Sequence, residues 1–368
     1  MPSYLVLAFS LAGASLYWAR LEEDGRHNLA LAVVLVAISL GIVLFAAELF
    51  TNAVEWFGHR LGLSEGAVGS VLAAVGTAMP ETMIPLIAIL FIGSEEADDI
   101  GVGAILGAPF LLSTAAFAVT GIGAILFKGR RVSGSDLRLD AEVIRRDIGY
   151  FFMVYTIAIA SSFLPWKETK LAVAVLLLAL YGLYLYRTFT DETPVEREAE
   201  EAMAGLRVHT LLRRVGAPPT GLIVFQLLVA LGFIIGGAQL FVTNLDIVAS
   251  DLGVAPLALA LVIAPLATEL PEKFNSILWV RQGKDTLAMG NISGAMVFQS
   301  CIPVTIGVVF TEWELTETAL VSAVIALFST GVVYMSIRSR GYLSSYVLAR
   351  AGLLWVGFVA YVIVKLSV

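Results

Sequence analysis

Two short stretches of this sequence place a carboxylate inside an apolar segment. "GTAMPE" (76–81) ends in Glu81, and "ATELPE" (267–272) ends in Glu272 and carries a second carboxylate, Glu269. A charged side chain near the centre of a bilayer costs about 2.5–3.5 kcal/mol or more, so such residues usually mark an ion pathway. The alternative is that Glu81 and Glu272 stay protonated and only hydrogen-bond between helices. That alternative explains neither the proline before each glutamate nor the repetition of the motif.

Each motif also contains a threonine. Thr77 lies four residues before Glu81, and Thr268 lies four residues before Glu272, so each pair shares one helix face. Either threonine alone could instead bond back to its own helix. Carboxylate and hydroxyl oxygens suit hard cations such as Ca²⁺ and Na⁺, whereas Zn²⁺ and Cu⁺ favour nitrogen and sulfur ligands.

Three prolines add backbone oxygens to this set. Pro80, Pro265 and Pro271 each lack the N–H that would bond to the carbonyl four residues earlier in a helix. Within hydrocarbon, a carbonyl freed in this way is tolerated only where it lines a cavity or finds another partner. Each motif therefore offers a carboxylate, a hydroxyl and an unpaired carbonyl within about one helical turn.

The composition shows what kind of element carries these motifs. The chain has 368 residues, of which 58% are hydrophobic and 14% charged, with a mean hydropathy of +0.88. A soluble domain carries about a quarter charged residues. The sequence therefore predicts an all-α polytopic membrane protein. The expected spans are 3–19, 29–57, 66–92, 100–127, 148–163, 169–187, 220–249, 254–281, 284–310, 316–337 and 346–366.

Several functional classes find no support in the sequence. Cys301 is the only cysteine, so a disulfide within the chain is impossible, and the three histidines suggest no metal cluster. An intramembrane hydrolase would need a paired Asp, a Ser–His or an HExxH arrangement, and none is visible. We expect no enzyme, no cofactor and no nucleic-acid partner. The expected partners are inorganic cations and the lipid bilayer, with the chain a monomer.

Loop charges predict the orientation. Cations gather in the loops on one side, which the positive-inside rule makes cytoplasmic. These cations are Lys128, Arg130, Arg131, Arg138, Arg145, Arg146, Arg197, Arg207, Arg213, Arg214, Arg281, Lys284, Arg338 and Arg340. The opposite loops carry acids, namely Glu95, Glu96, Asp98, Asp99, Glu312, Glu314 and Glu317. We expect a prokaryotic inner or plasma membrane protein with a cytoplasmic N-terminus and an external C-terminus.

The two motifs belong to an internal repeat. Residues from 47 onward match those from 238 onward without gaps, and the two motif-bearing spans run in opposite directions. Identical residues recur 191 positions after Leu49, Phe50, Leu61, Gly62, Ala67, Val71, Ala73, Thr77, Pro80 and Glu81. In secondary transporters an inverted repeat places the substrate site at the midplane between the halves. The predicted units are an extra N-terminal helix and loop (1–28), a first half (29–187, repeat about 41–127), a cytoplasmic linker (188–219) and a second half (220–368, repeat about 232–310).

These stretches resemble the alpha repeats of the cation/Ca²⁺ exchanger superfamily, especially its sodium/calcium exchanger branch. The motifs that carry the resemblance are "GTAMPE", "ATELPE", the upstream "AELFTNAVE" and the downstream "GNISGAMVFQS". The resemblance implies a ten-helix inverted-repeat exchanger core, to which the span at 3–19 is an addition. It also implies that two long helices, 29–57 and 220–249, slide across the others to give alternating access.

The resemblance also implies a ligand set. Glu81 and Glu272 become the central carboxylates shared by Ca²⁺ and the coupling ion. Thr77 and Thr268 ligate through oxygen, with the carbonyl of Ala74 nearby.

Several oxygen ligands of the family are replaced here. The serine that follows each threonine in the family is Ala78 in the first motif and Glu269 in the second. In the third helix of each repeat, the ligand positions read Ala108 and Leu112 in the first half, and Ala295 and Gln299 in the second. Asn291 has Ala104 as its counterpart. Glu269 and Gln299 join the candidate ligands, and coupling to Na⁺ loses support.

Lys273 is a candidate charge partner for Glu269. The two residues are four apart with the glutamate first, which is the favourable order for an ion pair on a helix. Lys273 could then stand beside the site as a tethered cation. It could equally extend toward the cytoplasmic interface and contact nothing.

Together these observations predict an antiporter that moves Ca²⁺ or a related hard cation in exchange for Na⁺ or H⁺. A degenerate homologue that binds cations without coupled exchange is one alternative, because several ligands are missing. A cation channel is the other, although channels usually surround a pore with identical subunits.

Overall fold

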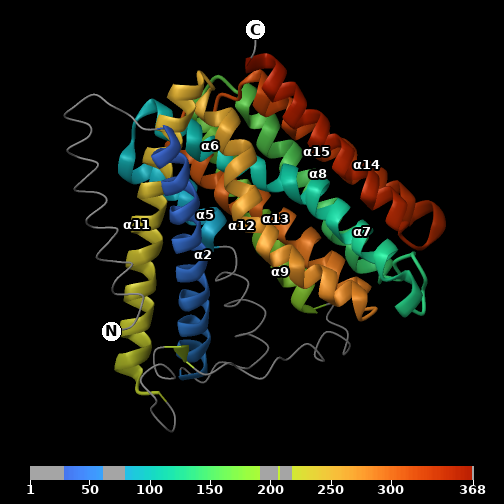
Figure 1. The fold of residues 1–368 in the computed structure, drawn as a ribbon. Helices are drawn as coiled ribbons and strands as arrows, with labels where there is room; N and C mark the ends of the chain where they lie inside the picture. The colour runs from blue at the N-terminus through green and yellow to red at the C-terminus, as the bar shows by residue number, and fades with distance from the viewer. Residues whose placement is uncertain (1–28, 61–78, 191–205, 208–217, 367–368) are drawn as a thin grey trace.

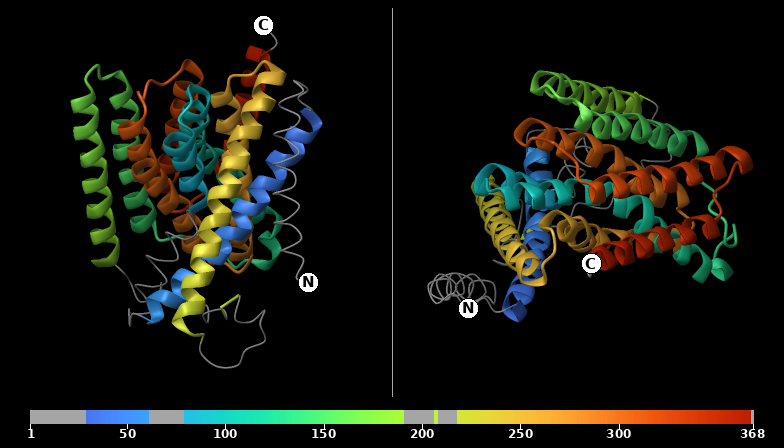
Figure 2. Two further views of the ribbon diagram at one scale, coloured as in Figure 1. Left: turned by 90° about the vertical axis from the view of Figure 1, so that its left-hand side faces the viewer. Right: turned by 90° about the horizontal axis from the view of Figure 1, so that it is seen from above.

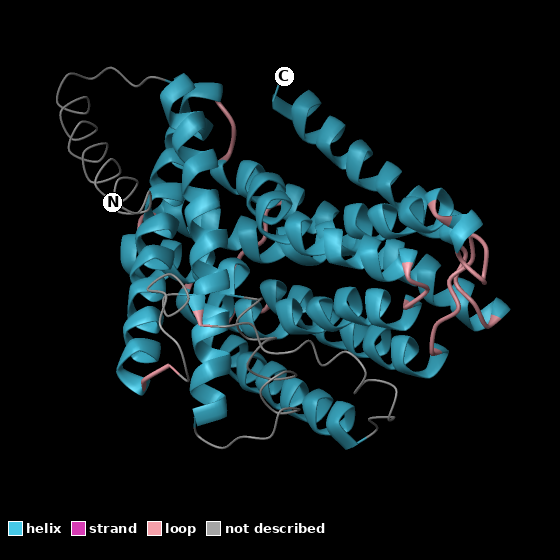
Figure 3. Ribbon diagram, turned by 60° about the horizontal axis from the view of Figure 1, so that its bottom comes forward, coloured by secondary structure: helices cyan, strands magenta, loops and turns pink. Residues whose placement is uncertain are grey.

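The computed structural model describes residues 29–60, 79–190, 206–207 and 218–366. Within these ranges the chain is helical and contains no β-strand, apart from one isolated bridge between Leu137 and Leu343 (Figure 3). Seven of the described helical spans are long and apolar enough to cross a membrane. The protein is therefore an all-α, polytopic integral membrane protein, as the sequence predicts.

Each expected span from residue 29 onward has a helix, and the span expected at 3–19 lies outside the described residues. The first half contains α2 (Leu29–Arg60), α5 (Met79–Ile87) with a π-helical turn (Ala88–Ile92), α6 (Glu95–Leu111), a π-helical turn (Leu112–Ala116), α7 (Phe117–Leu126), α8 (Ala141–Ala160) and α9 (Lys167–Thr190). The second half contains α11 (Thr220–Leu252), α12 (Pro256–Arg281), α13 (Asp285–Phe310), α14 (Glu317–Arg340) and α15 (Ser345–Leu366). Helices α6 and α7 form one continuous span through the π-helical turn.

One helix begins much earlier than its hydropathy suggests. Helix α8 starts at Ala141, whereas the apolar run starts at residue 148. Asp140 caps it, because its carboxylate accepts hydrogen bonds from the backbone N–H groups of Glu142 and Val143 at 2.9 and 3.3 Å. The first turns of α8 are therefore polar and include Asp147.

The two longest helices, α2 and α11, pack side by side at one edge of the molecule (Figures 1 and 2). Gln226 of α11 donates its amide N–H to the Leu49 carbonyl at 2.9 Å and to the Asn52 side chain at 3.1 Å. Further along α11, the absence of a Cβ on Gly237 leaves room for the side chain of Val43 on α2. The pair is thus joined by close packing and by a buried polar contact.

The remaining helices pack in matched pairs. Helix α13 contacts α8 and α9, and the α6–α7 span contacts α14 and α15 in the corresponding way. Likewise, α5 contacts α13, and α12 contacts α6. Each of these contacts between the halves has a counterpart in which the two halves exchange roles, as expected for a repeated unit. The division of the chain at 188–219 stays a prediction.

Buried apolar residues form two clusters. The smaller cluster joins α2, α5 and α11 to the N-terminal parts of α6 and α12, and includes Ile84, Ile100 and Phe241. The larger joins α6–α9 to α12–α15, and includes Phe151 and Trp313. Helices α6 and α12 contribute to both clusters, so the crossing of these two helices lies between the two cores.

Three loops meet at one end of the helices. Arg131, after α7, makes two hydrogen bonds to the carboxylate of Asp285 at 2.8 and 2.9 Å, and both side chains are at most 1% exposed. The same arginine donates to the carbonyl of Val280, the penultimate residue of α12. The Leu137–Leu343 bridge adds the α14–α15 loop. These three basic loops therefore lie on the same side, and their assignment to the cytoplasm stays a prediction.

Candidate cation site

Glu81 lies in the interior of the helix assembly. It is the third residue of α5 and is only 6% exposed, beside the buried Pro80. A narrow pocket at this point is lined by residues of α5, α6 and α12. The lining residues are Glu81, Ile84, Ala104, Ala108, Ala264, Pro265 and Thr268. The structure therefore brings Glu81 of the first motif together with Thr268 of the second, and their role as ligands stays a prediction.

Thr268 is 2% exposed and donates its hydroxyl hydrogen to the carbonyl of Ala264 at 3.1 Å. This is the bond back to its own helix that the sequence left open as an alternative to ligation. The hydroxyl hydrogen is committed to Ala264, so the oxygen lone pairs are the atoms that a cation would use.

Glu269 and Gln299 form a direct contact between α12 and α13. The side-chain N–H of Gln299 donates to the Glu269 carboxylate at 3.1 Å, and the two residues are 2% and 1% exposed respectively. The amide oxygen of Gln299 is buried without a hydrogen-bond partner among the described residues. A buried amide oxygen of this kind beside a carboxylate is suited to ligating a hard cation.

The other candidate ligands are described less fully. Thr77 and Ala74 lie outside the described residues. Glu272 and Lys273 lie within α12, where the structure describes their backbone but not their side chains. Helical rise places the Cα of Glu272 about 6 Å along the axis from that of Thr268. The contact between the two central glutamates, and the Glu269–Lys273 ion pair, stay predictions.

Glycines of α6 allow its backbone to touch α12. A Cβ on Gly107 would meet the carbonyl oxygen of Leu261, and one on Gly103 would meet that of Leu257. The Leu261 carbonyl is the one that Pro265 leaves without a helical partner. It is therefore covered by the α6 backbone, where Cα–H groups can approach it. This close packing holds α6 against α12, and both helices line the pocket.

The two helices α12 and α6 present different side chains to the pocket. Helix α12 lines the pocket with the hydroxyl of Thr268, whereas α6 lines it with the methyl groups of Ala104 and Ala108. Glu269, the next residue of α12, contacts Gln299 of α13 instead of lining this pocket. Among the residues whose side chains are described, no group of three or more His, Cys, Asp or Glu residues is placed to hold a metal ion. The polar atoms that are described are carboxylate, hydroxyl and amide oxygens, which fit a hard cation.

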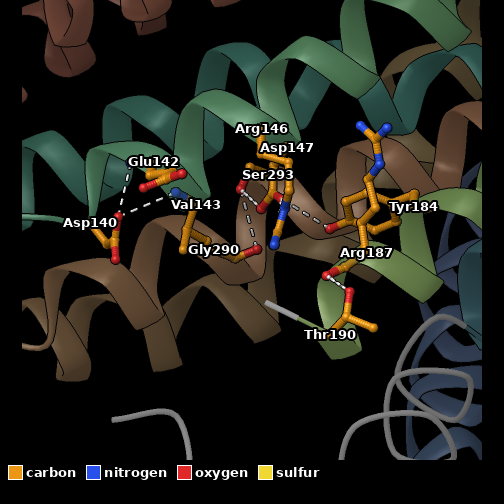
Figure 4. Close-up of polar contacts among 10 residues, drawn as sticks. All are labelled: Asp140, Glu142, Val143, Arg146, Asp147, Tyr184, Arg187, Thr190, Gly290 and Ser293. Carbon is orange, nitrogen blue, oxygen red and sulfur yellow. Dashed lines mark hydrogen bonds and ion pairs between the residues drawn. The ribbon is translucent and has the colours of Figure 1, made fainter. Parts of the chain in front are cut away.

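Sequence reasoning missed a further buried carboxylate. Asp147 of α8 is 2% exposed and is bonded to Ser293 of α13 and Tyr184 of α9 (Figure 4). Hydropathy alone placed Asp147 just before a span. The capping residue Asp140 was the signal that could have extended α8 over it.

The comparison with known protein families gives one clear match. The family described as "Sodium/calcium exchanger protein" matches residues 31–190 and 222–366, which is most of the chain. The inner membrane protein YrbG of Escherichia coli (strain K12) is 25% identical over 289 residues, covering 78% of this chain and 83% of that protein.

Solved structures share the fold. The H⁺/Ca²⁺ exchanger CAX aligns over 98% of this chain and 92% of its own, with a TM-score of 0.66 and 18% identity. The sodium-calcium exchanger NCX_Mj aligns over 90% of this chain and 99% of its own, with a TM-score of 0.53 and 16% identity. These likenesses show a shared fold, and the family match supports the cation/Ca²⁺ exchanger superfamily that the two motifs suggested. The chain belongs to the sodium/calcium exchanger protein family.

Proposed function

We propose that the protein is a secondary-active antiporter that moves Ca²⁺ or a related hard cation in exchange for Na⁺ or H⁺ by alternating access. The family is one of exchangers rather than of enzymes. Glu81 and Glu272 are the central carboxylates of this proposal, with Thr77, Thr268, Glu269 and Gln299 as further ligands.

One observation carries the proposal. Glu81 of α5 and Thr268 of α12 line one buried pocket, and the motifs that contain them are repeats of each other. A buried carboxylate beside an apolar wall is costly unless it binds a proton or a cation, or is otherwise paired. An ion that binds between the two motifs would therefore contact both halves of the protein. Alternating access requires such a shared site.

The α6 residues that line the pocket help to decide between Na⁺ and H⁺ as the coupling ion. Ala104 and Ala108 give the first half no side-chain oxygen at two lining positions, so few ligands remain for several Na⁺ ions. Carboxylates placed close together raise the proton affinity of at least one of them. We therefore favour H⁺ as the coupling ion. If Lys273 is the partner of Glu269, Lys273→Met should impair exchange, and Glu269→Gln/Lys273→Met should recover part of it.

The test is Ca²⁺ flux in proteoliposomes, driven in turn by a pH gradient and by a Na⁺ gradient. Glu81→Gln and Glu272→Gln each keep the side-chain size but remove the charge, so each should abolish flux. Glu314→Gln, at an exposed glutamate in the α13–α14 loop, is the matched control and should transport normally. Near-normal flux in either core variant contradicts the central-carboxylate assignment.

The same preparation separates the alternatives. A degenerate homologue would be stabilised by Ca²⁺ against heat yet show no flux under either gradient. A channel would show single-channel conductance far above the turnover of a transporter. Exchange driven by Na⁺ with no response to pH would leave the antiporter intact but remove the preference for H⁺.

A further inference from the structure

We propose that Asp147 is a positioning residue for the cation site, acting through Ser293 to fix the rotation and depth of α13. This inference rests on the proposed function, because it concerns the affinity of that site. Asp147 lies on α8 and bonds to Ser293 of α13, and α13 also carries the candidate ligand Gln299.

The contacts of Asp147 are short and buried. The hydroxyl of Ser293 donates to one carboxylate oxygen at 2.8 Å, and the hydroxyl of Tyr184 donates to the other at 3.2 Å (Figure 4). The guanidinium of Arg146 lies 3.3 Å from the second oxygen. Asp147 and Ser293 are 2% and 1% exposed. Since burying a carboxylate is costly unless its oxygens are bonded, this set of donors holds three elements in one arrangement.

Ser293 bonds both to another helix and, at a longer distance, to its own helix. Its distance to the carbonyl of Gly290 is 3.4 Å, longer than its 2.8 Å bond to Asp147. Serines in membrane helices commonly bond to the preceding turn, as Ser300 does on the same helix by donating to Met296 at 2.7 Å. Ser293 therefore makes its shorter bond between helices, whereas Ser300 bonds within α13.

The geometry of α13 connects Ser293 to the site. Ser293 and Gln299 are six residues apart, which corresponds to a rise of about 9 Å and a rotation of about 120° between their directions. One face of α13 thus meets Asp147, and another meets Glu269. A rotation or a slide of α13 that relaxed the first contact would also move the Gln299 amide relative to Glu269. Through Ser293, Asp147 therefore determines the position of the Gln299 amide relative to Glu269.

The experiment compares matched variants by Ca²⁺ affinity. Ser293→Ala removes the bond between helices, and Ser300→Ala removes a buried serine bond within α13. Tyr184→Phe removes a donor to the same carboxylate from α9, which carries no candidate ligand. Half-saturating Ca²⁺ should rise about three- to tenfold in Ser293→Ala. It should stay within about twofold in the other two variants. It is measured both by flux and by Ca²⁺-dependent thermal stabilisation of the purified protein.

A double variant tests the route through Gln299. If Asp147 acts by positioning Gln299, Ser293→Ala should have little further effect on Ca²⁺ affinity in a Gln299→Ala background, because coupled sites are not additive. Equal affinities in Ser293→Ala, Ser300→Ala and wild type would overturn the inference, as would full additivity with Gln299→Ala. If Ser293→Ala does not accumulate, Asp147→Asn replaces it and should shift the affinity in the same direction.

The failure of this inference is distinguishable from that of the proposed function. A wild-type protein that shows neither Ca²⁺ flux nor stabilisation by Ca²⁺ would contradict the proposed function. A wild-type protein that binds Ca²⁺, with variants that lose only thermal stability, would contradict the positioning role alone.

Discussion

Gln299 of α13 donates its amide N–H to the carboxylate of Glu269 on α12 across 3.1 Å, in a region where both residues are almost fully buried. Both helices belong to the second predicted half of the chain. The residues that correspond to Gln299 and Glu269 in the first half are Leu112 and Ala78. Among the candidate ligands whose side chains are described, Glu81 belongs to the first half and Thr268, Glu269 and Gln299 belong to the second, although the helix contacts are matched between the halves.

The Glu269–Gln299 contact predicts a stability effect. Gln299→Met keeps an unbranched side chain of similar length but removes a donor to a buried carboxylate. The free energy of unfolding should fall by about 1–3 kcal/mol. Gln282→Met, at an exposed position after α12, is the control and should change it by less than about 0.5 kcal/mol. Denaturation of the two proteins in the same detergent compares them, and equal stability would contradict the contact.

Gly107 tests the approach of α6 to α12. The added methyl group of Gly107→Ala would overlap the Leu261 carbonyl and approach the Pro265 ring to 2.6 Å. Overpacking of this kind should destabilise the protein by about 1–3 kcal/mol. Gly149→Ala, where a methyl group would meet nothing within 4 Å, should be neutral or slightly stabilising. Thermal unfolding of both variants checks this, and a neutral Gly107→Ala would show that the two backbones can separate freely.

The Arg131–Asp285 pair should be among the most sensitive positions outside the site. Asp285→Asn leaves Arg131 as a buried charge, and such a loss costs about 3–5 kcal/mol. Arg131→Lys should also destabilise, because lysine lacks the planar fork that holds both carboxylate oxygens. Arg130→Lys, at the neighbouring exposed arginine, should be silent. Yield and melting temperature of the purified proteins are the measurements, and wild-type values for Asp285→Asn would refute the assigned cost.

The predicted orientation can be tested with single cysteines in a background that lacks Cys301. Arg138→Cys, in the basic α7–α8 loop, should resist an impermeant thiol reagent added to intact cells. Glu314→Cys, in the acidic α13–α14 loop, should react. Both positions are exposed in the structure, so burial does not explain a lack of labelling. Labelling of Arg138→Cys from outside would reverse the topology.

Hydropathy predicted the helices well because each must span the bilayer and satisfy its own backbone. It failed at the start of α8, where the polar turn after Asp140 lies within a helix although its sequence is not apolar. The existence of a span is therefore encoded locally, whereas its polar ends are fixed by capping and by contacts with other helices.

The site was predictable only in part. The repeat and its spacing singled out Glu81 and Thr268, which line one pocket, while their role as ligands stays a prediction. The partner of Glu269 was not predictable, because a contact between α12 and α13 depends on how two helices rotate against each other. The bond from Ser293 to Asp147 joins residues 146 positions apart, and no local pattern specifies it.

The Arg131–Asp285 pair also has a consequence for biosynthesis. The two residues are 154 positions apart, and Asp285 begins α13. At a synthesis rate of about 5–20 residues per second, Arg131 leaves the ribosome about 8–30 s before its partner. During this interval the loop after α7 is already synthesised but lacks Asp285, the partner of Arg131. The buried Arg131–Asp285 pair can form only once α13 has been made, so the first half of the chain completes its folding after the start of α13 has reached it.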